Sequence, residues 1–98
     1  MAWNLAEVVY DGLNVSVNAQ EANPYCAFFK PDGTKMFVVG FTNDTVFQYT
    51  LSTAWDVSTA TYDSISKSVS AQDNSARHVW FKDDGTKMFV LGNQNTKL

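Results

Sequence analysis

The chain has 98 residues and a mass of 10.9 kDa, enough for one small domain with a thin core, since a domain of this size buries only about two thirds of its unfolded surface. Its 45% hydrophobic content argues against disorder, and its low charged share of 17%, beside many Ser, Thr and Asn residues, is typical of exposed sheets and turns. A net charge of -3 excludes the basic surface that nucleic acid or an anionic membrane needs as a partner.

The first predicted element, residues 4–17, belongs to a repeat. Shifting the chain by 52 positions aligns Met1 with Thr53 without a gap, and 19 of the 46 aligned pairs are identical. Trp3 and Trp55 form one identical pair. Self-similarity of this extent predicts a repeating fold, with repeat 1 at 1–52 and repeat 2 at 53–98. Two full repeats would need six more residues than the chain has, so we expect the last unit to be incomplete.

The next elements form a hairpin that occurs twice. A short apolar strand at 25–30, with its copy at 77–82, is followed by a turn and by a second strand at 35–40. Both turns contain an Asp-Gly pair, in which glycine can adopt the left-handed φ that a tight turn requires. We therefore assign a structural role to four turn residues: Asp32, Gly33, Asp84 and Gly85. The strand at 35–40 is apolar on both faces and must be covered on both sides.

Two further strands follow in repeat 1, and they are progressively more polar. Residues 46–51 alternate between apolar and polar side chains, and residues 62–70 alternate more weakly among many serines. Burial is thus expected to fall from the first two strands to the last. Four antiparallel strands graded in this way and repeated every 40 to 55 residues or so describe a β-propeller blade.

The run PDGTKMFVVGFTNDTVFQYTLST also resembles the blade repeat of bacterial and phage propellers of the YVTN type. In that family a Pro-Asp-Gly turn leads one strand and an Asn-Asp-Thr-Val stretch opens the next. The resemblance implies an all-β propeller with about two four-stranded antiparallel blades in this chain. Some relatives with this architecture are lactonases or metal-dependent hydrolases.

Fewer than two blades cannot close a propeller, which usually has about 4 to 8 blades. The expected strand order begins with an outer strand, residues 4–17, and ends after an inner one. Identical chains are therefore expected to close a ring by completing one another's blades. Two blades per chain favour a trimer or a tetramer, with a pentamer as a further option. The rival interpretation is that the chain is a fragment of a longer propeller.

Several residues are candidates for ligand binding, each with a structural alternative. Asp32 and Asp84 suit a calcium ion, but an Asp in such a turn usually caps the turn itself. His78, the only histidine, aligns with Cys26 on the innermost strand and is a candidate for a channel metal or ligand. Trp3 and Trp55 could form sugar-stacking platforms or could pack between blades. The single cysteine is interpreted as a small apolar residue.

The sequence contains no set of nucleophile, base and orienting acid, and no phosphate-binding loop. We therefore expect a non-enzymatic scaffold or binding module without a cofactor, soluble, with glycan or protein as its ligand. A cell-surface or virion protein is compatible with this expectation. The alternative is a lactonase-like hydrolase that uses a metal near His78 and channel residues of several chains.

Overall fold

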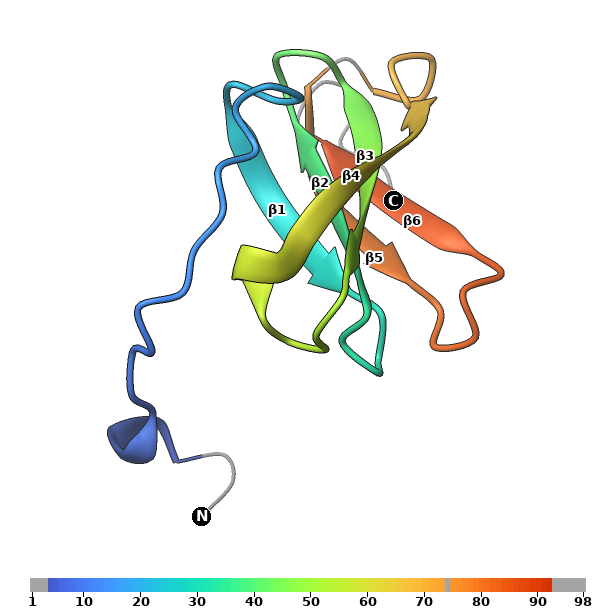
Figure 1. The fold of residues 1–98 in the computed structure, drawn as a ribbon. Coiled ribbons are helices and arrows are strands. Elements are labelled where there is room, and N and C mark those ends of the chain that lie inside the picture. Colours follow the sequence, from blue (N-terminus) through green and yellow to red (C-terminus); the bar gives the residue numbers. More distant parts are fainter. Residues whose placement is uncertain (1–3, 74, 93–98) are drawn as a thin grey trace.

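The computed structural model describes residues 4–73 and 75–92 and contains two antiparallel sheets (Figure 1). Sheet A has the order β1-β2-β3-β4, and sheet B is the hairpin β5-β6. The strands of sheet A are β1 (Pro24–Phe29), β2 (Lys35–Gly40), β3 (Thr45–Leu51) and β4 (Ala60–Ser68). Those of sheet B are β5 (Ala76–Phe81) and β6 (Met88–Gly92). The prediction of an all-β chain is confirmed, with strand ends one or two residues from the expected ones.

The two hairpins β1-β2 and β5-β6 have the same register. Phe28 pairs with Phe37 in sheet A, and Trp80 pairs with Phe89 in sheet B, which are the positions 52 residues further on. Each ladder also has an irregularity at its start, between Pro24 and Cys26 in one and between the equivalent residues in the other. The sequence repeat is therefore a structural repeat, although β4 lies in repeat 2 and pairs within sheet A.

Strand β2 is covered on both faces, in agreement with its continuous apolar sequence. Met36 and Val38 pack into a cluster with the apolar side chains of β3. Val39 faces the other way and packs into a second cluster between sheets A and B. Strand β5 lies against β1 and β2, so the two sheets stack face to face (Figure 1). Strand β4 is exposed over most of its length, so burial falls toward the edge of sheet A.

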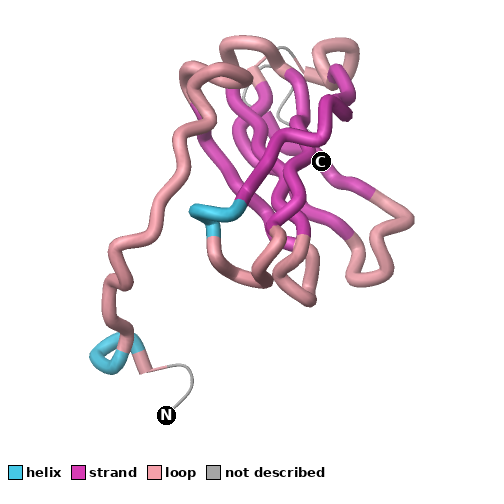
Figure 2. Tube along the Cα trace, viewed as in Figure 1, coloured by secondary structure: helices cyan, strands magenta, loops and turns pink. Residues whose placement is uncertain are grey.

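The prediction of an outer strand at residues 4–17 is wrong for the isolated chain. The segment contains the 3-10 helix η1 (Leu5–Glu7), which lies apart from sheet A, and continues as a loop that runs up to the sheet (Figure 2). A strand needs a neighbouring strand to form hydrogen bonds with, and no strand of the described chain pairs with this segment. Only its end, Val15 and Val17, packs against sheet A.

Neither sheet closes on itself in the described residues, and the propeller stays a prediction. Within the same residues no helix is long and apolar enough to cross a membrane.

Candidate functional site

The turns between the paired strands of each hairpin are built on an aspartate. The backbone N–H and the hydroxyl of Thr34 both donate to Oδ1 of Asp32, at 2.9 and 2.6 Å. Lys30 lies 3.1 Å from the other carboxylate oxygen of Asp32. In the second turn Asp84 accepts the same two hydrogen bonds from Thr86. Both aspartates therefore cap their own turns.

These contacts stabilise the charged form of both carboxyl groups. Hydrogen bonds from the side chain and backbone of Thr34, together with Lys30, lower the pKa of Asp32 from 3.8 to about 2. The pKa of Asp84 is lowered for the same reasons, with Thr86 and Lys82 as the partners. Each carboxylate is ionised at neutral pH and already bonded within its turn.

Trp55 covers the turn of sheet A. Its backbone N–H donates to the carbonyl of Gly33 at 2.9 Å, and its indole lies 5.5 Å from the ring of Phe29. The indole lies so close to Gly33 that any Cβ at this position would overlap it. Gly33 is buried as a result. Trp55 is thus a packing residue of the turn, although 59% of its surface is exposed.

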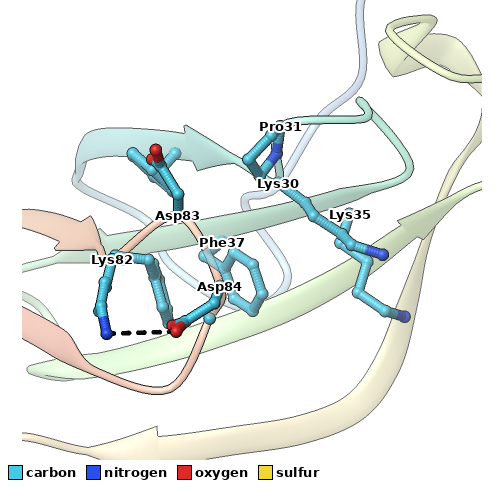
Figure 3. Close-up of a pocket in the computed structure, with 10 residues that line it drawn as sticks. Lys30, Pro31, Lys35, Phe37, Lys82, Asp83 and Asp84 are labelled. Carbon is cyan, nitrogen blue, oxygen red and sulfur yellow. Dashed lines mark ion pairs between the residues drawn. The ribbon is translucent and has the colours of Figure 1, made fainter.

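The equivalent turn of sheet B lacks such a cover among the described residues. Gly85 is exposed, and no described atom lies within 4 Å of a Cβ placed there. A cavity of about 220 Å³ opens beside it, between the two turns (Figure 3). Its floor is aromatic, and its rim carries the charged side chains of both turns. The lining residues are Phe28, Lys30, Pro31, Lys35, Phe37, Phe81, Lys82, Asp83, Asp84 and Gly85.

The charges on the rim of this cavity largely compensate each other. Lys82 is paired with Asp84 at 3.2 Å, which Figure 3 marks with a dashed line. Lys30 is paired with Asp32 at 3.1 Å, and Lys35 lies 3.9 Å from a carboxylate oxygen of Asp63. The cavity is therefore suited to an uncharged aromatic group better than to a simple ion.

His78 and Cys26, which the repeat aligns, are also in contact. The Sγ atom of Cys26 lies 3.5 Å from Nδ1 of His78 and 3.7 Å from the carbonyl oxygen of Val79. The imidazole stacks on Trp80 with ring centroids 6.3 Å apart. The described residues bring no group of three or more metal-ligating side chains together. His78 lies on β5 and Trp55 in the loop between β3 and β4, and no contact joins these two predicted ligand-binding residues. Trp3, the third, lies outside the described residues.

The outer face of sheet B consists of His78, Trp80, Phe89 and Leu91, all exposed. The two β5 side chains also reach sheet A, because His78 contacts Cys26 and Trp80 packs on Phe28 with ring centroids 4.8 Å apart, so the free part of this face is Phe89 and Leu91. Trp80 keeps 55% of its surface exposed, and Phe89 and Leu91 keep 42% each. The equivalent residues of sheet A are Cys26, Phe28, Phe37 and Val39, which all pack into the cluster between the sheets. The outer face of sheet B therefore has the composition of a face that is buried elsewhere in the same chain.

The far face of sheet A, turned away from sheet B, shows the converse relation. It contains Ala27, Phe29, Met36 and Val38, and a cavity of about 440 Å³ opens on it. The equivalent residues in sheet B are Val79, Phe81, Met88 and Val90, which pack between the two sheets. Met36 and Val38 are already buried in the cluster that Val15 and Val17 cover, so the open part of this face lies along β1, where Ala27 is exposed and Phe29 half-buried beside the cavity.

Sequence reasoning missed two buried carboxylates at equivalent positions, Glu21 and Asp73, which are 0% and 3% exposed. Glu21 accepts hydrogen bonds from the backbone N–H groups of Asn23, Thr42 and Asn43, at 3.0, 3.2 and 3.2 Å. It thereby ties the loop before β1 to the loop after β2. The sequence feature that could have revealed these carboxylates is an acidic residue at the same place in both repeats, 19 residues before a glycine.

Comparison of the chain with family models, curated proteins and solved structures finds no significant match.

Proposed function

We propose that the chain is a non-enzymatic, self-associating scaffold and binding module whose sheets are the blades of a β-propeller. The observation that carries the proposal is the match between its two ends. The outer face of sheet B, where Phe89 and Leu91 are exposed, has the residue types that sheet A buries. On the far face of sheet A the β1 side, Ala27 and Phe29, stays open beside the cavity, and its counterparts in sheet B pack between the two sheets. A second copy can therefore continue the same stack.

Contact between these faces is head-to-tail, and such contacts give a closed ring when the rotation between copies divides a full turn. Two sheets per copy require an even number of blades. Three copies with six blades and four with eight are favoured, with five and ten as a further option. Burial of the exposed aromatic and aliphatic side chains supplies the driving force.

The ligand of such a ring is proposed to be a glycan or a protein, bound by loops at one end. Support comes from the loops being rich in Ser, Thr and Asn and from an exposed indole edge at Trp55. Screening of the purified protein on a glycan array tests this part of the proposal. Reproducible binding of one glycan class supports it, and an array without hits removes glycan in favour of a protein ligand.

Sedimentation velocity of the wild-type chain and of Leu91→Asp, a change at an exposed residue outside both core clusters, tests the self-association. We expect a discrete oligomer for the wild type and a monomer for the variant, because a carboxylate on the outer face of sheet B would be buried without a partner. Thr61→Asp, on the exposed part of β4, is the matched control and should assemble normally. A wild-type chain that stays a folded monomer at micromolar concentration contradicts the proposal.

The alternative is a metal-dependent hydrolase of the lactonase kind. The contact between Cys26 and His78 favours it, because sulfur and imidazole are both metal ligands. Metal analysis of the purified protein separates the two functions. Stoichiometric metal that is lost in His78→Gln supports the hydrolase, and protein without bound metal supports the scaffold.

A further inference from the structure

We infer that the cavity between the two turns is a seat for a tryptophan, and that Trp3 of a second copy of the chain occupies it. This inference rests on the self-association proposed above and names the side chain that enters the neighbour. The same site also occurs in sheet A, where a tryptophan of the chain itself fills it.

In sheet A the seat consists of Phe29 and Gly33, and Trp55 fills it. A shift of 52 residues converts the first two into Phe81 and Gly85, which both line the cavity. The counterpart of Trp55 in repeat 1 is Trp3. The chain therefore contains one seat with an indole, one seat open in its described part, and a second indole with the same sequence neighbours.

The residues that follow Trp3 have the backbone of those that follow Trp55. Each tryptophan precedes a 3-10 helix, η1 or η2 (Val57–Thr59), and each helix is capped by a side chain, Asn4 in one case and Asp56 in the other. The irregular point of the strand also recurs, since Gly12 has a φ of 78° and its counterpart Ser64 in β4 a φ of 59°. The N-terminal segment thus shares two local features with the segment that leads into and forms β4, namely a capped 3-10 helix and a positive φ at the same repeat position.

The segment pairs with no strand in the described part of its own chain. Leu5 is 84% exposed, Val9 82% and Tyr10 78%, so the residues next to Trp3 contact little of their own sheets. In β4 the counterpart of Tyr10, Tyr62, packs against the cluster of sheet A and pairs with Tyr49. A second copy is the occupant that satisfies both the open seat and the unpaired segment.

Two variants test the indole and its seat independently. Trp3→Ala removes the occupant, and Gly85→Asn places a Cβ where the indole would lie. Asparagine tolerates the φ of 75° at Gly85, so the turn itself is retained. Ser64→Asn is the matched control, because Ser64 is exposed on β4, also has a positive φ of 59°, and lies outside both the cavity and the N-terminal segment.

Each of the two variants should weaken self-association at least about thirtyfold, the loss typical of a tryptophan at the centre of an interface. An equimolar mixture should form a heterodimer by native mass spectrometry, because the Gly85→Asn chain supplies Trp3 and the Trp3→Ala chain supplies an open seat. Circular dichroism confirms that both variants remain folded.

The inference is overturned if the wild-type chain assembles and both variants assemble as tightly. It is also overturned if Ser64→Asn weakens assembly as much as Gly85→Asn does. A wild-type chain that remains monomeric contradicts the proposed function instead, so the two failures are distinguishable.

Discussion

Asp32 and Asp84 stabilise the turns that contain them. Each accepts two hydrogen bonds from the threonine two residues later and pairs with the lysine two residues earlier. The folded pKa of Asp32 lies below its ordinary value, so its bonds stabilise the fold fully above about pH 3.8 and lose that effect as the pH falls toward about 2. Acid should therefore weaken the hydrogen bonds of the Asp32 turn within this pH window.

The hydroxyl of Thr34 is the largest contributor to this lowered pKa. We expect Thr34→Val to raise the pKa of Asp32 from about 2 toward its ordinary 3.8, with the backbone hydrogen bond retained. Titration of the carboxyl carbon by NMR measures the change. The pKa of Asp84 serves as the internal control and should stay where it is, and an unchanged Asp32 titration would rule out the hydroxyl as the cause.

A second residue-scale prediction concerns Glu21. Replacing it with alanine leaves three backbone donors unpaired in a buried place, so we expect Glu21→Ala to lower the free energy of unfolding by about 3 kcal/mol. Urea denaturation gives the value. Lys67→Ala, on the exposed surface of β4, should change it by less than about 0.5 kcal/mol. Equal losses in the two variants would show that the buried network is unimportant.

At the scale of elements, repeated hairpins and alternating strands were predictable because register and burial follow directly from the order of apolar side chains. Strand β2 illustrates this, since its two apolar faces require two cores. The state of residues 4–17 was not predictable, because a strand is defined by a neighbour and this neighbour is not a local property of the sequence. The Trp55 cover of Gly33 was likewise hidden, since it joins residues in two different loops.

The two turn glycines provide a prediction at this scale. Gly33→Asn must displace the indole of Trp55, whereas Gly85→Asn meets open space in the chain by itself. We expect the first variant to lower the thermal unfolding midpoint by several degrees and the second to leave it nearly unchanged, when both are measured at a concentration where the chain is monomeric. Equal midpoints for the two variants would mean that Trp55 does not stabilise the turn.

At the scale of the whole molecule, the described chain is a stack of two sheets that leaves apolar surface exposed at both ends. These surfaces are the outer face of sheet B and the β1 side of the far face of sheet A, and the N-terminal segment pairs with neither sheet. The repeat length predicted blades that other copies of the chain would complete, and this stays a prediction. The sequence could not show which side chains would form the contact between two copies. That information lies in the structure, where the same repeat position is buried in one sheet and exposed in the other.

Native mass spectrometry of the purified wild-type chain tests this central claim most directly. The account predicts one dominant closed oligomer, three or four copies in mass, whose size does not grow with concentration. A folded species with the mass of a single chain at micromolar concentration, or an open series of ever larger assemblies, would contradict it.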